Sequence, residues 1–247
     1  MIIRADFHLH SCLSPCGALS MSPRAIASAL AELNINLAAI TDHNSALNAP
    51  AFAQACHEYG VTPLFGIEAQ PQEECHILCL FADLESVQIL SDELYQAMPM
   101  IMNIPEKMGD QVYVDEEENI IGEVDKYLVS SADISLDDLA ARVVELGGLV
   151  IPAHVDRPSF SLTSQFGVIV DGPWDALEVV KMPGCSEEGP AFDTRGYPLI
   201  TSSDAHYPEN IGQRAFDLDI QNDALCKTSG TADMQVIKNA LSRRPRC

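Results

Sequence analysis

The segment ADFHLH at residues 5–10 places two histidines one residue apart, with an aspartate at the same spacing before them. The wider run IIRADFHL predicts a β-strand at residues 2–9. Alternate side chains of a strand share a face and lie about 6.6 Å apart along the chain, so His8 and His10 could converge on one metal ion. Asp6, deeper on that face, could accept a hydrogen bond from a ligand imidazole. Taken alone, however, such a pair would more often be two core histidines.

The remaining histidines, with one exception, also lie at the boundaries of predicted strands. Residues with metal-binding side chains that share this placement are His43 after 37–41, Glu68 at the end of 61–68, His76 at the start of 76–82, His154 after 149–153, and Asp204 and His206 after 198–203. The exception is His57, which we expect on the surface of a helix at 49–59. In a barrel of parallel strands the carboxyl ends meet at one rim, where active sites are built from several strands. We therefore expect these residues to surround one site.

Predicted helices alternate with the strands over most of the chain. They cover residues 23–33, 49–59, 84–97, 136–146 and 231–243, and a further strand is predicted at 176–180. Ser22 followed by a proline, and Ser135 followed by Asp138, are typical of helix starts. This alternation is typical of an α/β protein with parallel strands. We expect residues 99–133 to be an inserted excursion, whose acidic cluster at 115–118 forms a solvated hairpin tip.

Length and charge restrict the class of protein. A chain of 247 residues commonly forms one α/β barrel, so we expect a single domain over residues 1–247. The 36 acidic residues against 14 lysines and arginines give a formal net charge of -22, which disfavours extended nucleic-acid binding. No apolar run approaches the roughly 20 residues of a membrane span, and the N-terminus lacks signal-peptide features. We expect a cytoplasmic protein without a membrane partner, whose eight cysteines are reduced thiols.

The ordered motifs DFHLH, TDHN, GIE, ECH, AHVDR and SDAH resemble those of the polymerase and histidinol phosphatase (PHP) superfamily of metal-dependent phosphoesterases. The resemblance extends from residue 6 to residue 206. It implies a distorted (β/α)7 TIM-like barrel with two or three divalent metal ions, such as zinc, manganese or iron. Within the superfamily, the chain looks closer to small bacterial phosphoesterases, including nucleoside phosphate phosphatases and short-RNA exonucleases, than to the histidinol phosphatases.

The resemblance also implies which residues hold each ion: His8, His10, Glu68 and Asp204 the first; Glu68, as a bridge, with His76 and His154 the second; and His43 and His206 the third. The sequence departs from the family pattern after His10. There SCLSPCG supplies Cys16 where the family usually has an aspartate or a histidine. Cys16 would either bind the third ion, which would favour zinc because thiolates select it, or only line the loop and leave this site weak.

Such a cluster would suit the cleavage of a phosphate ester. The ligands are mostly neutral imidazoles, so bound dications would leave the pocket cationic although the whole chain is acidic. Metal ions bind phosphate oxygens, activate water as the nucleophile and stabilise the leaving oxygen. Arg157, and with less support Arg195, could clamp phosphate oxygens or form ordinary surface ion pairs. We expect hydrolysis of a small phosphomonoester, such as a nucleotide, or of a short oligonucleotide end, by a metal-activated hydroxide.

Two other functions fit parts of the pattern. Metal-dependent amidohydrolases also have an HxH pair on the first strand and a late aspartate, but they typically add a bridging lysine where this chain has Glu68. A metal-stabilised module without catalytic activity, bound to a partner protein, is the other alternative. The complete set of candidate ligands weighs against it. Substrate, oligomeric state and the acid that protonates the leaving group are left open by the sequence.

Overall fold

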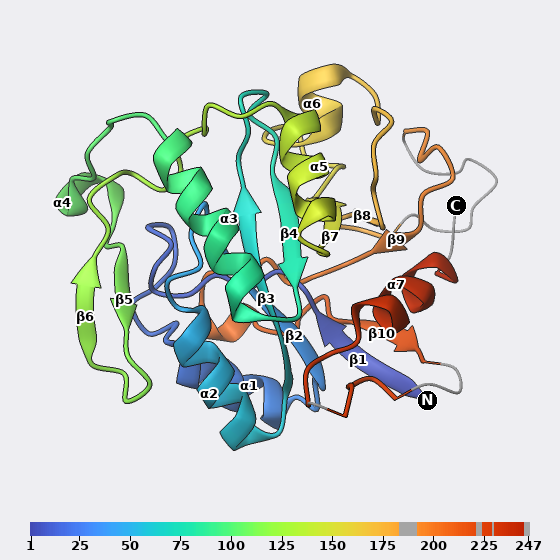
Figure 1. Cartoon of the computed structure of the whole chain (residues 1–247), viewed down its shortest axis with the longest axis horizontal. Coiled ribbons are helices and arrows are strands. Elements are labelled where there is room, and N and C mark those ends of the chain that lie inside the picture. The colour runs from blue at the N-terminus through green and yellow to red at the C-terminus, as the bar shows by residue number, and fades with distance from the viewer. Residues whose placement is uncertain (183–191, 221–223, 229, 245–247) are drawn as a thin grey trace.

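Short runs of β-branched and small apolar residues form the central sheet of the structure, a computed structural model that describes residues 1–182, 192–220, 224–228 and 230–244. Its six strands have the order β10-β1-β2-β3-β4-β7 and curl into a half-barrel (Figure 1). The strands are β1 (Ile2–Asp6), β2 (Leu37–His43), β3 (Thr62–Ala69), β4 (Ile77–Phe81), β7 (Leu149–Pro152) and β10 (Phe216–Asp219). The mixed α/β class expected from the sequence is confirmed.

We had expected a wholly parallel sheet, but the sheet is mixed. β1, β2 and β3 run parallel, whereas β4 runs antiparallel to β3 and β7, and β10 runs antiparallel to β1. The connection at residues 70–76 is too short for the dozen or more residues that a parallel crossover needs. The reversed direction of β4 places its first residues, rather than its last, beside the carboxyl end of β3.

A second, short sheet lies beside the first. β8 (Leu177–Glu178) and β9 (Leu199–Ile200) are parallel to each other. The amide of Asp175 donates to the carbonyl of Val150 over 2.9 Å, and Leu9 forms an isolated bridge with Ala205. Single hydrogen bonds, rather than a regular ladder, thus connect this pair to β7 on one side and to the chain after β1 on the other. The closed seven-stranded barrel stays a prediction.

Capping residues mark the starts of two of the predicted helices. The structure has α1 (Pro23–Glu32), α2 (Ala49–Tyr59), α3 (Leu84–Ala97), α4 (Pro105–Met108), α5 (Leu136–Glu145), α6 (Leu162–Phe166), α7 (Met234–Ser242) and a short 3-10 helix, η1 (Pro208–Asn210). The Ser22 hydroxyl accepts from the amide of Ala25, and the Ser135 hydroxyl accepts from that of Asp138. The five predicted helices are confirmed to within a few residues. None of the described helices is long and apolar enough to cross a membrane.

Both faces of the sheet are buried, which fixes the alternation of residues along β4. Ile77 and Cys79 pack into a cluster under α3 and α5, whereas Leu78 and Leu80 pack into another that includes residues of α7. A third cluster joins α1 and α2 to β2. This two-sided burial explains the continuous apolar run of β4. It also holds the strand ends that carry the histidines.

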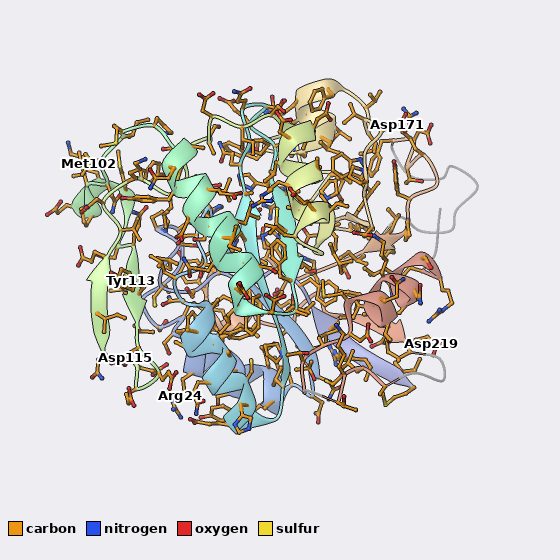
Figure 2. All side chains as sticks on the ribbon, viewed as in Figure 1. Arg24, Met102, Tyr113, Asp115, Asp171 and Asp219 are labelled. Carbon is orange, nitrogen blue, oxygen red and sulfur yellow. The ribbon has the colours of Figure 1, made fainter. Side chains whose placement is uncertain are left out.

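Residues 99–133 contain α4 and a hairpin of β5 (Val112–Val114) and β6 (Ile120–Glu123) at the periphery of the molecule (Figure 1). Asp115 lies at the tip of this hairpin (Figure 2), where its carboxylate accepts from the amides of Glu117 and Asn119. The acidic cluster is thus a hairpin tip. That the whole stretch is an insertion into a single domain stays a prediction.

Candidate metal centre

The two histidines of the opening motif leave the sheet before they meet. β1 ends at Asp6, four residues before His10, so neither histidine belongs to the strand. Beyond it the chain stays extended, with Phe7 and Leu9 fully buried on the apolar side. His8 and His10 therefore point to the opposite side, and their Nε2 atoms lie 3.2 Å apart. The convergence expected from the spacing occurs, although the strand ladder does not extend that far.

Glu68, at the end of β3, lies at the centre of a ring of imidazoles. Its side chain is 1% exposed, and ring nitrogens approach its two carboxylate oxygens closely. The distances are 3.2 Å from His8 Nε2, 3.3 Å from His10 Nε2, 3.1 Å from His43 Nδ1, 2.7 Å from His76 Nδ1 and 3.1 Å from His154 Nε2. The antiparallel direction of β4 is what brings His76, just before that strand, to this rim. Four separate segments therefore meet at one carboxylate.

Asp204 and His206 close the ring from the chain after β9. Asp204 Oδ1 lies 3.3 Å from the Nε2 atoms of both His8 and His10. The His206 ring stacks on that of His10 with 4.2 Å between centroids. Its Nδ1 donates to the carbonyl of Asp204, which leaves Nε2 available. Asp204 has a φ of 50°, an uncommon value for a residue other than glycine, and this turn directs both side chains inward.

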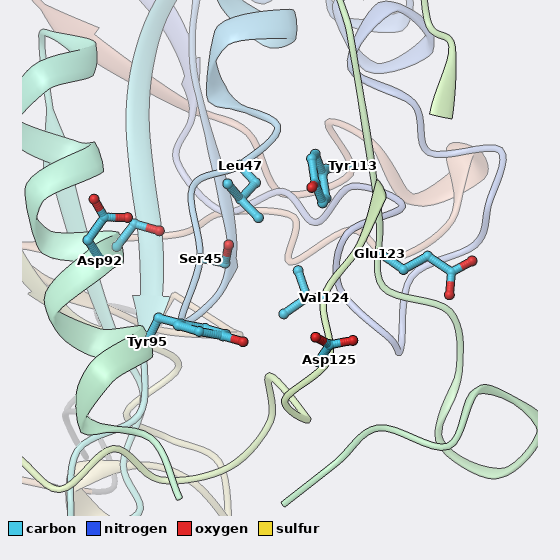
Figure 3. A pocket seen from close by; sticks show the side chains of 9 residues that line it. Ser45, Leu47, Asp92, Tyr95, Tyr113, Glu123, Val124 and Asp125 are labelled. Atoms are coloured by element: carbon cyan, nitrogen blue, oxygen red, sulfur yellow. The ribbon is translucent and has the colours of Figure 1, made fainter. Parts of the chain in front are cut away.

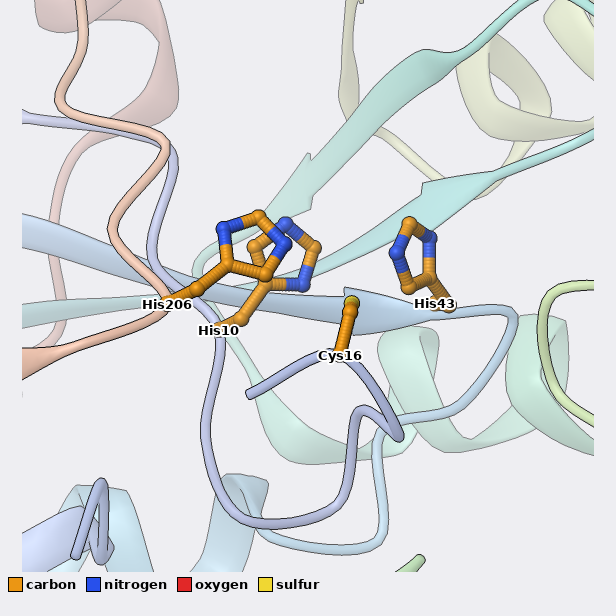
Figure 4. Close-up of side chains that lie close together, drawn as sticks. All are labelled: His10, Cys16, His43 and His206. Atoms are coloured by element: carbon orange, nitrogen blue, oxygen red, sulfur yellow. The ribbon is translucent and has the colours of Figure 1, made fainter. Parts of the chain in front are cut away.

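Cys16 joins the same region. Its sulfur and ring nitrogens of His10, His43 and His206 all lie within 4.8 Å of one another (Figure 4). Figure 4 shows these side chains converging from separate segments, with Cys16 reaching in from its own loop. Of the two alternatives left open by the sequence, this position favours Cys16 as a ligand over Cys16 as a residue that only lines the loop.

The donor set fits divalent ions. Within the described part of the chain, the buried Nδ1 atoms of His43 and His76 have no hydrogen-bond partner, although each faces a Glu68 oxygen. Potential ligand atoms gather in three groups: His8, His10 and Asp204; His43, Glu68 and His76; and His10, Cys16, His43 and His206. Imidazole, thiolate and carboxylate ligands are those that zinc and similar metals take in proteins. The structure therefore has a cluster that could hold metal ions. In the second group His43 stands where the resemblance implied His154, although His154 Nε2 also lies 3.1 Å from Glu68.

Buried side chains bind the nitrogens of His8 and His10 that point away from Glu68. Nδ1 of His8 lies 3.0 Å from Oε2 of Glu178, and the same oxygen accepts a hydrogen bond from the amide of His154. The Ser14 hydroxyl donates to Asp42, so it accepts from Nδ1 of His10 over 3.0 Å. Such partners set the tautomer of a ligand histidine and turn its other nitrogen to the metal.

Glu178, which the sequence motifs did not indicate, contacts His8 in the way that the spacing predicted for Asp6. Asp6 is buried, but it accepts from the amides of Ser203 and Gly212 rather than from an imidazole. This carboxylate therefore binds the backbone on both sides of Asp204 instead of a ring of the cluster. The signal for Glu178 was present as one acidic residue within the apolar strand ALEVV. The sequence of that segment, however, does not indicate which residue Glu178 contacts.

Charges inside the ring are strongly coupled. Burial raises the pKa of Glu68, but the neighbouring histidines, His76 foremost, outweigh burial and hold it well below the usual value. Burial lowers the pKa of His10, whereas its hydrogen bonds to Asp204 and Glu68 outweigh this effect and raise it to about 9. The carboxylates are therefore anionic at neutral pH, and His10 competes with any cation for them.

The two candidate arginines lie in different places. Arg157 forms an ion pair with Asp204 and lines a cavity of about 240 Å³ over Glu68 and the imidazoles. Arg195 instead pairs with Asp171 over 2.7 Å, and Asp171 lies at the periphery (Figure 2). The Arg195 side chain points toward residues 169–171, so the structure does not bring it to the cluster. His57 is exposed on α2, as expected.

A second cavity, of about 250 Å³, lies between α3 and the β5–β6 hairpin (Figure 3). Its walls carry Asp92, Tyr95, Tyr113 and Asp125, and they include no histidine or cysteine among the described residues. It therefore lacks the donor set found over Glu68. The cysteines that the structure describes are all free thiols, and Cys185 and Cys247 lie outside the described residues.

Comparison with known proteins supports the interpretation of the cluster. The sequence model of the PHP domain family matches residues 6–148. The chain is similar in structure to the lesion-specific endonuclease Endonuclease Q from Pyrococcus furiosus, with a TM-score of 0.64 and 17% identity over 98% of this chain and 56% of that one. This chain thus spans little more than half of the endonuclease.

Two shorter solved structures are covered almost completely. One is a putative metal-dependent phosphoesterase from Bifidobacterium adolescentis, with a TM-score of 0.56 and 16% identity over 98% of this chain and 96% of that one. The other is an amidohydrolase from Chromobacterium violaceum with bound sulfate, with a TM-score of 0.52 and 20% identity over 87% of this chain and 92% of that one. A search of curated proteins found no match. At these identities the likeness concerns the fold.

Proposed function

Because the chain belongs to the PHP domain family, we propose that the cavity over Glu68 hydrolyses a phosphate ester with the help of two or three divalent metal ions. The observation that carries the proposal is the position of Glu68, with imidazoles from four segments within 3.3 Å of its oxygens. The substrate would be a small phosphomonoester, such as a nucleotide, or the end of a short oligonucleotide.

Divalent ions would give the cavity the positive charge that a phosphate substrate needs. Glu68, Glu178 and Asp204 are buried carboxylates, and Arg157 is the cation at the mouth. In the metal-free protein the raised pKa values of His8 and His10 keep both rings protonated, so their charges offset these carboxylates. Divalent ions would displace these protons, leave the cavity cationic, bind phosphate oxygens and activate water for attack.

The residues of the chain would share the task in the following way. His8, His10, Glu68 and Asp204 would hold one ion; Glu68, His76 and His154 a second; and His43, His206 and Cys16 a third. Glu178 and Ser14 would keep the rings of His8 and His10 in the orientation seen in the structure. Arg157 donates to Asp204 through one nitrogen of its guanidinium, so its other N–H groups could bind phosphate oxygens. Zinc, manganese and iron are the candidate metals.

We also propose that the two sheets form the distorted seven-stranded barrel implied by the resemblance. The amide of Val155, which follows β7, donates to the carbonyl of Glu178 in β8 over 2.8 Å. The bridge between Leu9 and Ala205 connects the chain after β1 to the chain after β9. On this proposal the chain is one domain, and residues 99–133 are an insertion that packs on the rim.

The direct test is phosphate release by purified protein whose bound metals have been counted. We expect Mn²⁺- or Zn²⁺-dependent release from mononucleotides, ribose 5-phosphate or p-nitrophenyl phosphate, and a loss of at least about 100-fold in His8→Ala and Asp204→Ala. His57→Ala is the matched control, because His57 is an exposed histidine on α2 and should leave the rate unchanged. Hydrolysis of cyclic amides without phosphate release would favour an amidohydrolase. Stable metal binding without any turnover would favour a noncatalytic module.

A further inference from the structure

The mouth of the cavity over Glu68 carries an aromatic ring with no assigned task. Phe160 lines the cavity together with Arg157, and its side chain is 40% exposed. One face of its ring stacks on His76, with 5.0 Å between centroids and 19° between planes. The ring therefore shields a candidate ligand on one side and leaves apolar surface open at the entrance on the other.

The backbone holds Phe160 in a conformation that local preference does not explain. Its φ is 53°, in the left-handed region that bulky residues rarely adopt. The carbonyl of Phe160 accepts from the amide of His76 over 3.0 Å, and the hydroxyl of the next residue, Ser161, donates to the carbonyl of Arg157 over 2.7 Å. Ser161 also caps α6. The loop is thus tied at both ends, so Phe160 and Arg157 are presented together in fixed positions.

A second aromatic side chain lines the cavity. Tyr127 and Val129, from the end of the 99–133 stretch, line the same cavity. The imidazoles that line the cavity surround Glu68, whereas Tyr127, Val129 and Phe160 give its lining an apolar part. A substrate with an anionic end and a planar aromatic end would match this division. Aromatic side chains bind bases by stacking, which tolerates different bases because each has a π face.

We propose that Phe160 is the stacking platform for the base of a nucleotide whose phosphate lies over Glu68. The inference rests on the proposed phosphoesterase function and names the substrate class of that site. It makes Phe160 a specificity-determining residue rather than a metal ligand. The base could belong to a free mononucleotide or to the terminal nucleotide of a short oligonucleotide. Both present the same phosphate and the same planar ring to the cavity.

The test compares substrates with and without a base in three variants. For Phe160→Leu, we expect KM for AMP to rise about tenfold with kcat nearly unchanged, in line with the loss of one stacked base, and no change for ribose 5-phosphate. Phe160→Trp should restore the affinity for AMP. Phe166→Leu is the matched control, because Phe166 is also 40% exposed but lies on α6 and does not line the cavity. Adenosine should inhibit ribose 5-phosphate hydrolysis by the unchanged protein more strongly than by Phe160→Leu.

The results separate this inference from the proposed function. Equal losses on AMP and ribose 5-phosphate would mean that Phe160 only supports His76, and would overturn the inference while the phosphoesterase function stands. Equal KM values for both substrates in the unchanged protein would overturn it as well. Absence of hydrolysis of every phosphate ester would contradict the proposed function itself. A 5′-phosphorylated trinucleotide used beside AMP shows which source of the base is preferred.

Discussion

At the scale of single residues, the buried Glu178 side chain orients two of the candidate metal ligands. Its carboxylate holds both Nδ1 of His8 and the amide of His154, so it orients residues from two different segments. We predict that Glu178→Ala lowers the affinity for Zn²⁺ by about 10- to 100-fold, the usual effect of removing a partner that orients a metal ligand. Competition with a fluorescent chelator measures this. Asp171→Ala, which removes an exposed carboxylate, is the control, and an unchanged affinity in Glu178→Ala would contradict the assignment.

The raised pKa of His10 makes metal binding depend on pH. Its folded-state pKa of about 9 lies above the ordinary value of 6.5, so the metal-free protein keeps this imidazole protonated at pH 7. Its favourable contribution to metal-free stability is present below pH 6.5 and is lost as the pH rises through about 9. A metal ion binds the neutral ring, so an ion held by His10 must displace this proton.

We therefore predict that affinity for Zn²⁺ rises with pH between 6 and 9, by up to about tenfold per unit for each proton displaced. Calorimetric titrations in buffers with different ionisation enthalpies would count the released protons. An affinity that stays constant across this range would show that His10 is not in contact with the metal.

At the level of elements, the 99–133 stretch and the loop carrying Cys16 meet at Gly109. A Cβ atom at this position would lie 1.9 Å from the carbonyl oxygen of Pro15, and its φ is +99°. We predict that Gly109→Ala displaces the two segments, lowers the free energy of unfolding by more than the roughly 1 kcal/mol that positive-φ strain costs, and weakens the group around Cys16. Chemical denaturation and metal counting measure the two effects.

Gly60→Ala is the matched control for this substitution. Gly60 ends α2 with a φ of +73°, and a Cβ there would meet nothing within 4 Å. It should therefore show the cost of backbone strain alone and keep all bound metal. If Gly109→Ala behaved in the same way as Gly60→Ala, the contact between the two segments would not matter for the centre.

The elements themselves were largely predictable from local signals, whereas their long-range contacts were not. Ser22 and Ser135 marked helix starts correctly because a cap depends only on residues nearby in the chain. The direction of β4 was predicted wrongly, since it depends on the length of one connection rather than on the strand's own sequence. Arg195 and Glu178 have partners 24 and 170 residues away, which no local pattern specifies.

For the whole molecule, the metal ions should contribute to stability as well as to function. Ions that bind only the folded state stabilise it by about 4 kcal/mol at a thousand times their Kd, and each kcal/mol shifts Tm by roughly 2–4 °C in a protein of this size. We predict that removing the metal with a chelator lowers Tm by about 10 °C and that Zn²⁺ or Mn²⁺ restores it. An identical Tm with and without chelator would contradict a folded-state metal cluster.

On the proposal made above, segments far apart in the sequence form one centre for divalent ions around Glu68. Anomalous diffraction from crystals of the metal-loaded protein, recorded above the absorption edge of the bound metal, tests it most directly. We predict two or three anomalous peaks within ligand distance of Glu68, His8 and Asp204, with one of them also next to Cys16. Density for a loaded metal only elsewhere, with the imidazoles hydrogen-bonded to one another and to Glu68, would show that this cluster is not a metal centre.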